Sequence, residues 1–150
     1  MTFPTHEKYY LDSRTEELIE LSIRSINEKV ERAFSAENGS LAFSAFDSVP
    51  PWWKRFFFGV KENVRMYFII EWADGFCGLI FHDEYGSEYR VLANPDQNEV
   101  PENIRQQISF GEPKPVAMKH CLPFDDGKKL ISEFLETGEK PSSVEYDYVE

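Results

Sequence analysis

Apolar residues recur with helical spacing near the N-terminus, and charged residues fill the positions between them. Ser13 and Glu16 match the S-x-x-E pattern of a capping box, and Asn38-Gly39 is typical of a helix end. The apolar residues with this spacing are Ile19, Ile23, Ile26, Val30 and Phe34. The pattern predicts a long helix over residues 13–37.

After residue 39 the pattern changes to alternating, β-branched and aromatic residues, which favour strands. Turn residues at Ala73-Asp74-Gly75 and at 83–87 separate three consecutive strands, so these strands must be antiparallel. The region around 102–107 fits one helical turn. Strands are predicted at 41–46, 64–72, 76–82, 88–93, 116–122 and 144–149.

The segment after Pro123 has the signals of a short amphipathic helix. Asp125 or Asp126 can cap its start, and both carboxylates suit the positive end of the helix dipole. Gly138 fits the left-handed position after the last turn, and Pro141 follows it. One apolar face combines Leu130, Ile131, Phe134 and Leu135, which we expect in the core.

These elements predict one α+β domain over residues 1–150. Its single antiparallel sheet should have about five to six strands. A long N-terminal helix should precede the sheet, and an edge strand should follow the short C-terminal helix.

Residues 49–58 combine two prolines with five aromatic residues. Pro50-Pro51 forces an extended or turn conformation. If the aromatic side chains are buried, they anchor a helix on the sheet; if some are exposed, they form an apolar patch that marks a partner surface. The sequence leaves both interpretations open, and Trp52 and Trp53 are the candidates for exposure.

The composition is strongly acidic, with 27 Asp and Glu against 16 Lys and Arg and a formal net charge of −11. Nucleic-acid binding needs a basic face, so neither DNA nor RNA is expected as a partner, and an anionic membrane surface is disfavoured for the same reason. Complementary charge favours a basic protein partner. Solubility alone is the competing explanation for the acidic composition.

Most of the negative charge comes from two segments. Residues 82–102 hold six acidic residues against Arg90, and residues 123–150 hold eight against three lysines. If the two segments lie on one side of the sheet, they would form one acidic face. The candidate partner-binding residues are Asp83, Glu84, Tyr85 and Glu88 at the turn, with Trp52 and Trp53 as apolar anchors.

Candidate chemistry is sparse. The three histidines have no second His or Cys at metal-ligand spacing, and motifs for phosphate or dinucleotide binding are absent, so no metal, cofactor or catalytic residue is expected. A dyad of His82 with Cys121 remains an alternative. Cys77 and Cys121 are isolated and do not form a disulfide framework. The start of the chain has no secretory signal pattern, and no apolar run is long enough for a membrane span. We therefore expect a cytoplasmic protein with reduced thiols.

The C-terminal pattern of Leu-Pro, helix, E-F-L-x-T-G-x-x-P and short strand resembles immunity protein family 1 of bacterial polymorphic toxin and contact-dependent inhibition systems. The resemblance covers about the last thirty residues and implies a small cytosolic inhibitor, not an enzyme. It also implies a toxin partner that is a nucleic-acid deaminase or nuclease. The matching positions are Leu122, Pro123, Phe134, Leu135, Gly138 and Pro141.

The sequence is therefore compatible with three functions. The first is an immunity protein, a monomer or weak dimer when free, that masks the active site of a cognate toxin domain. The second is an acidic interaction or adaptor module, or a homo-oligomeric structural domain. The third is an enzymatic or small-molecule domain that uses His82 or His120.

Overall fold

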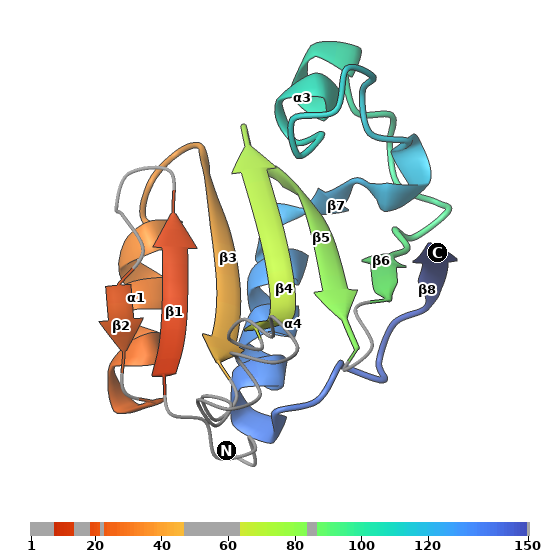
Figure 1. Ribbon diagram of the computed structural model, residues 1–150. Helices are drawn as coiled ribbons and strands as arrows, with labels where there is room; N and C mark the ends of the chain where they lie inside the picture. Colours follow the sequence, from red (N-terminus) through yellow and green to blue (C-terminus); the bar gives the residue numbers. More distant parts are fainter. Residues whose placement is uncertain (1–7, 14–18, 22, 47–63, 84–86, 150) are drawn as a thin grey trace, which may run out of the picture.

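The computed structural model describes residues 8–13, 19–21, 23–46, 64–83 and 87–149 (Figure 1). Four of the candidate contact residues, Trp52, Trp53, Glu84 and Tyr85, lie outside these ranges. Within the ranges, no helix has both the length and the apolar character needed to cross a bilayer.

One antiparallel sheet organises the described part of the chain, with the strand order β2-β1-β3-β4-β5-β6-β8 and β7 paired to β5 (Figure 1). Its strands are Lys8–Ser13 (β1), Ile19–Leu21 (β2), Gly39–Phe46 (β3), Val64–Ala73 (β4), Phe76–His82 (β5), Glu88–Val91 (β6), Leu122–Pro123 (β7) and Tyr146–Val149 (β8). Six of these strands have four residues or more, which agrees with the predicted number. The sheet is open, and β2 and β8 form its two edges.

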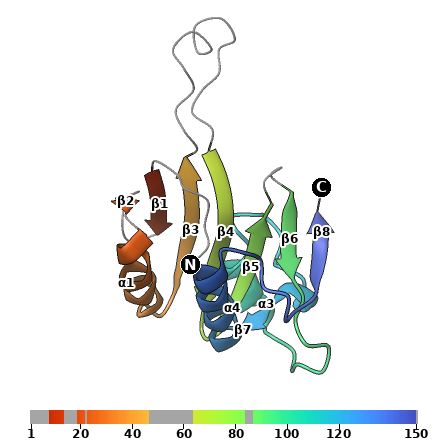
Figure 2. The same cartoon turned by 90° about the horizontal axis from the view of Figure 1, so that it is seen from below.

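Helices cover one face of this sheet. Figure 2 shows α1 (Ile23–Phe34) and α4 (Phe124–Thr137) on the same side of the row of strands. The short α3 (Glu102–Gln107) and the 3-10 turn η1 (Met118–His120) belong to the segment between β6 and β7. The α+β class, the C-terminal helix and the edge strand after it are confirmed.

The prediction of a long N-terminal helix over 13–37 is wrong, because α1 begins only at Ile23. The preceding segment forms strands instead: β1 pairs with β3 over its whole length, and β2 pairs back onto β1. Ile19, Leu21 and Ile23 alternate with polar residues and therefore fit a strand as well as a helix. Pairing of β2 with β1, which is itself paired with β3, decided between the two, and Ser13 ends a strand where a helix cap was expected.

The predicted strand at 116–122 is also wrong, except at its last residue. Val116 donates its backbone N–H to the carbonyl oxygen of Arg105 at 3.1 Å, and the Arg105 side chain donates back to the carbonyl oxygen of Val116 at 3.1 Å. These bonds hold the segment against α3, so only Leu122–Pro123 pairs with the sheet. Asp125 and Asp126 lie in the first turn of α4, but the capping residue is Pro123, which makes no side-chain bond.

The main core lies between the sheet and the helices α1 and α4, and a β-bulge in β4 contributes to it. In the register of β3 with β4, Phe43 pairs with Phe68 whereas Ser44 pairs with Met66, so Tyr67 is the extra residue. Tyr67 and Phe68 consequently both reach Phe134 of α4, with ring centroids 5.7 and 5.5 Å from its ring. The apolar face predicted for α4 is confirmed as core, with Leu130, Ile131, Phe134 and Leu135 all buried.

A second, smaller core lies on the opposite face of the sheet. Gly78 of β5 faces this side, and a Cβ there would stand 3.1 Å from the Phe110 ring and 3.2 Å from the Ile108 carbonyl oxygen. The buried carboxylate of Glu71 accepts a hydrogen bond from the backbone N–H of Phe110 at 3.0 Å. The apolar members are Ala73, Val100, Ile108, Val116 and Cys121. This core fixes the segment after β6 on the sheet.

Candidate functional site

The terminal strand lies beside the β5–β6 hairpin, whose sequence includes four of the six predicted contact residues. β6 pairs with β8 so that Glu88 is opposite Val149 and Tyr89 is opposite Tyr148. A hydrogen bond of 3.2 Å joins the hydroxyl groups of Ser87 and Tyr148. The two acidic segments of the sequence therefore meet at one open edge of the sheet (Figure 1).

Asp83 makes hydrogen bonds to Ser87 across the turn of the hairpin. Its N–H donates to the Ser87 carbonyl oxygen at 3.1 Å, and its Oδ1 accepts from the Ser87 N–H at 2.9 Å. The Tyr89 hydroxyl donates to Oδ2 at 3.3 Å, and partial burial together with this carboxylate raises the pKa of Tyr89. Asp83 thus has an evident structural role, which sequence reasoning did not anticipate.

The side chain of Glu88 lies on the face of β6 opposite to that of Tyr89, next to His82. Its Oε1 lies 3.8 Å from His82 Nε2, and its side chain is 40% exposed whereas that of His82 is 10% exposed. Burial lowers the pKa of His82, and the Glu88 carboxylate opposes part of this effect. Among the described residues, none is a hydrogen-bond partner of the buried Nδ1 atom of His82. Of this pair, Glu88 is the group that a partner can reach.

The negative charge of Asp147 is paired with side chains from the segment that precedes β7. Its Oδ2 lies 2.7 Å from His120 Nε2 and 2.9 Å from Lys119 Nζ. Hydrogen bonds from Lys119 and His120 lower the pKa of Asp147. Burial lowers the pKa of His120, although Asp147 opposes this. The contacts attach β8 to the rest of the fold.

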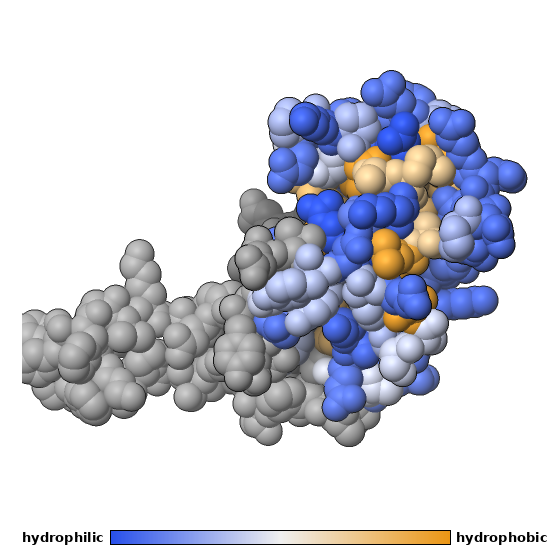
Figure 3. Space-filling model, turned by 90° about the vertical axis from the view of Figure 1, so that its right-hand side faces the viewer, coloured by the Kyte–Doolittle hydropathy of each residue, from blue (hydrophilic) through white to orange (hydrophobic). Residues whose placement is uncertain are grey.

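The described part of this edge is mixed in charge and does not form the uniformly acidic face that we expected. Its carboxylates are Asp83, Glu88, Glu145 and Asp147. Its cations are Arg90, Lys119 and Lys140. Figure 3 shows small hydrophobic spots among hydrophilic side chains on this side of the molecule, and not one continuous apolar surface. A partner would therefore be selected by discrete contacts.

Tyrosines line the face of this edge that is opposite to Glu88 and Asp147. The Tyr89 ring contacts the rings of Tyr146 and Tyr148, at centroid distances of 6.4 and 5.3 Å. Lys140 Nζ lies 3.6 Å from the centre of the Tyr89 ring, a cation–π contact. Tyr148 is 55% exposed and is the large hydrophobic side chain that stands out among the described residues. Sequence reasoning missed Tyr148, because its exposure depends on the place of β8 at the edge of the sheet, beside β6.

A second surface feature is a groove of about 700 Å³ between α1 and α4. Val30, Ile131 and Leu135 form its floor, and Glu31, Lys128 and Glu136 are among the residues at its rim. The floor side chains are already almost fully buried, so an occupant would remove little apolar surface from water. The edge at β8 is the stronger candidate for a protein partner.

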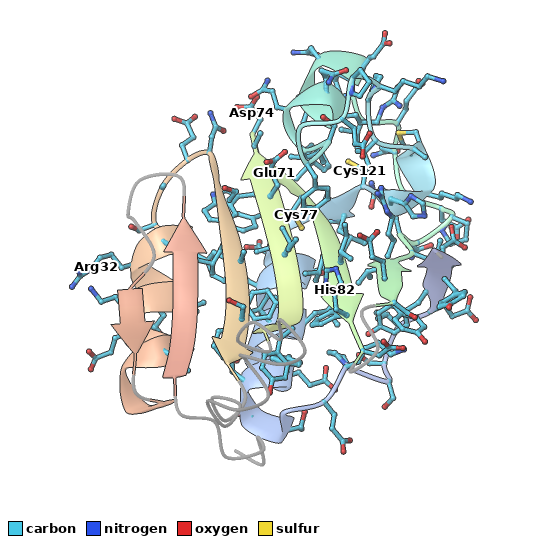
Figure 4. The ribbon with its side chains drawn as sticks, viewed as in Figure 1. Arg32, Glu71, Asp74, Cys77, His82 and Cys121 are labelled. Atoms are coloured by element: carbon cyan, nitrogen blue, oxygen red, sulfur yellow. The ribbon has the colours of Figure 1, made fainter. Side chains whose placement is uncertain are left out.

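The dyad of His82 with Cys121 is wrong. Cys121 precedes β7, which pairs with the Phe76–Cys77 end of β5, whereas His82 ends the same strand five residues later. That separation is about 16 Å along a strand, and Figure 4 shows the two labelled side chains well apart. Burial also raises the pKa of Cys121 to about 11 and that of Cys77 well above its ordinary value. Neither thiol is activated as a nucleophile.

Metal-ligating side chains do not cluster in the described ranges, where no group of three or more His, Cys, Asp or Glu could hold an ion. Comparisons with protein-family models, curated proteins and solved structures found no match for this chain.

Proposed function

We propose that this protein is an immunity protein, which binds a cognate toxin domain and masks its active site without catalysing a reaction. The observation that carries the proposal is the meeting of the hairpin and the terminal strand at one open edge, where Glu88 and Tyr148 are accessible. The toxin proposed is a basic domain that acts on nucleic acid as a deaminase or nuclease. The proposed setting is the cytoplasm.

The order of the C-terminal elements supports the proposal. Leu122-Pro123 leads into α4, and Gly138 ends that helix in the left-handed conformation with φ of 76°. Its N–H donates to the Phe134 carbonyl oxygen at 2.7 Å, and β8 follows Pro141. This is the arrangement that the resemblance to immunity protein family 1 implies, although its residues are structural and do not locate a contact surface.

The charge of the chain supports a basic partner. A net charge of −11 accelerates encounter with a basic domain and disfavours binding to the nucleic acid that such a domain acts on. In protein interfaces, aromatic side chains near the centre contribute most of the affinity, whereas rim charges mainly affect the association rate. Tyr148 fits the first role and Glu88 the second, and Trp52, Trp53, Glu84 and Tyr85 remain proposed contacts.

The test begins with capture of the partner. The tagged protein is incubated with lysate of its source at low and at moderate salt, and stoichiometric partners are identified by mass spectrometry. The partner is then purified, and its toxicity and nucleic-acid chemistry are measured with and without this protein. Inhibition at a 1:1 ratio is expected. A partner whose activity is unchanged by stoichiometric complex formation would contradict the immunity function.

Charge reversal then tests the surface. Glu88→Lys should slow association with the partner, and Glu84→Lys should do the same if the hairpin forms the contact. Glu112→Lys is the matched control, because Glu112 is exposed in the segment after α3 and makes the same change in net charge. Equal affinity of the Glu88 and Glu112 variants would place the contact elsewhere.

An interaction module that self-associates is the second candidate, and the open outer edge of β8 favours it. Sedimentation of the free protein over a range of concentrations separates the two. We expect a monomer or a weak dimer, whereas a stable dimer at low concentration would support the second candidate.

A further inference from the structure

The backbone of β8 has one side bonded to β6 and one side directed outward. The Leu92 N–H donates to the Glu145 carbonyl oxygen at 2.9 Å, which fixes the hydrogen-bonding phase of this strand pair. Hydrogen-bonded pairs alternate along an antiparallel ladder. Asp147 and Val149 therefore bond to β6, and the N–H and C=O groups of Tyr146 and Tyr148 point away from it.

The neighbouring strand pair has the complementary phase. The Asp83 N–H donates to the Ser87 carbonyl oxygen, so Tyr89 is bonded to β5 by the same alternation. Glu88 and Arg90 are left to bond to β8, which agrees with the bonds of Asp147 and Val149 to β6. Among the described strands none pairs with the outer side of β8, which Figures 1 and 2 show at the end of the sheet.

We propose that the outer edge of β8 accepts an extended segment of the toxin as an additional antiparallel strand. The identity of the occupant rests on the proposed function. In this mode the backbone groups of Tyr146 and Tyr148 supply affinity, and the side chains on the two faces select the segment.

The chemistry of β8 specifies that segment. Glu145 and Asp147 lie on one face of the strand, and Tyr146 and Tyr148 lie on the other. Asp147 is already paired with Lys119, whereas the exposed Glu145 forms no ion pair with the described residues. The segment that fits alternates basic residues with apolar or aromatic residues, in agreement with the negative charge of the chain.

A second copy of the chain fits this edge less well. The symmetric antiparallel register that uses both outward residues, with Tyr146 opposite Tyr148 of the other copy, also places Asp147 opposite Asp147. Like charges directly opposite each other destabilise a strand pair, and the contact of each Asp147 with Lys119 offsets only part of this repulsion. The described strand itself has no residue that blocks pairing at this edge, because Tyr146–Val149 contains neither Pro nor Lys.

The first test uses amide exchange on the free and the occupied protein, followed by NMR. In the free protein, the Tyr146 and Tyr148 amides should exchange faster than those of Asp147 and Val149. The probe is an eight-residue capped peptide that alternates Arg and Val. Its addition should slow exchange at Tyr146 and Tyr148, and unchanged exchange at a peptide concentration that saturates binding would overturn the proposal.

Two control peptides separate strand addition from attraction between charges. A peptide of the same composition, with its arginines and valines in two blocks, has equal charge and should bind at least about tenfold more weakly. In an antiparallel addition the valines lie opposite the tyrosines, and their backbone groups form the hydrogen bonds to β8. N-methylation of the valines should therefore abolish binding, whereas N-methylation of the arginines should preserve it. Equal binding of the valine-methylated peptide would overturn the proposal, whatever the protein variants show.

Protein variants provide the matched comparison. Tyr148→Pro removes the outward N–H together with the side chain, whereas Tyr148→Ala removes only the side chain. Proline is tolerated at an edge position whose N–H faces solvent, so the pairing of β6 with β8 should persist. We expect Tyr148→Pro to bind the alternating peptide at least about tenfold more weakly than Tyr148→Ala.

The same variants distinguish the two proposals. If a toxin is inhibited equally by Tyr148→Pro and Tyr148→Ala, strand addition is overturned and the immunity function stands. If the peptide binds as expected but the captured partner is not inhibited, the immunity function fails and β8 remains a strand acceptor. A concentration-dependent dimer that Tyr148→Pro abolishes would overturn the choice of a toxin segment as occupant.

Discussion

Gly127 of α4 lies directly against Cys77 of β5. A Cβ atom at position 127 would stand 2.5 Å from Cys77 Sγ and 3.3 Å from Ile70 Cδ1. Real Cβ atoms essentially never come as close to another atom as this Cβ would to the sulfur, and both neighbours belong to the buried core. The absence of a side chain at Gly127 therefore sets how closely the start of α4 approaches the sheet.

Gly127→Ala is expected to destabilise the protein, although alanine favours a helix. Overpacking in a close-packed core costs about 1–3 kcal/mol, whereas the gain in helix propensity is about 1 kcal/mol or less. The free energy of unfolding in urea measures the net effect. In the double variant with Cys77→Ala the sulfur is absent, so the effect of Gly127→Ala should be smaller there. An equal effect in both backgrounds would show that the contact is not responsible.

Both thiols should be unreactive in the native protein. Cys77 and Cys121 are fully buried, and burial raises the pKa of each, to about 11 for Cys121. A disulfide reagent added at mildly alkaline pH should modify them at a rate limited by opening of the structure, and rapidly in denaturant. Ser132→Cys, on the exposed side of α4, is the control that should react at once. Rapid modification of the native wild-type protein would contradict the packing.

Stability should fall as the pH is lowered through about 6.5, the ordinary pKa of histidine. Burial lowers the pKa of His82 and His120, while Glu88 and Asp147 offset part of this effect. Between the native and the ordinary pKa the unfolded chain binds more protons, which favours unfolding. The lowered pKa of Asp147, due to Lys119 and His120, adds a further loss at lower pH, as the carboxylate becomes protonated.

Urea unfolding from about pH 5 to pH 8 measures this dependence. His82→Gln and His120→Gln, made singly and together, should each flatten the decline below neutral pH. His6 remains in every variant, so its titration cancels in the comparison. A decline that is the same in the double variant as in the wild type would show that neither imidazole is responsible.

Glu71→Ala should loosen the segment that covers the second core. Glu71 is 8% exposed and accepts the Phe110 N–H, and Phe110 has a left-handed backbone with φ of 57°. Loss of the acceptor leaves a partly buried donor unpaired, at a cost near the lower end of the range of about 1–3 kcal/mol for a buried group. Glu71→Gln keeps an oxygen acceptor and should cost less. Limited proteolysis and amide exchange across residues 100–116 measure the effect, and equal protection in the two variants would contradict it.

The candidate site was only partly predictable. Turn residues located the hairpin, and Glu88 is accessible as expected, because such signals are local. The internal bonds of Asp83, the compensation of Asp147 by Lys119, and the exposure of Tyr148 depend on the pairing of β6 with β8. Residues far apart in the sequence make those contacts, so no pattern within either segment could show them.

The sequence by itself determined α4, because the apolar face of Leu130 and Phe134 and the left-handed Gly138 act within one helix. It also determined the hairpins of β4, β5 and β6, whose turns are short. Tertiary structure decided the secondary structure at Ile19. The local sequence there fits a helix or a strand, and the pairing of β2 with β1 and of β1 with β3 selects the strand. It also placed β8 at an open edge, because a strand acquires its neighbours, and keeps a free side, only when the whole sheet has formed.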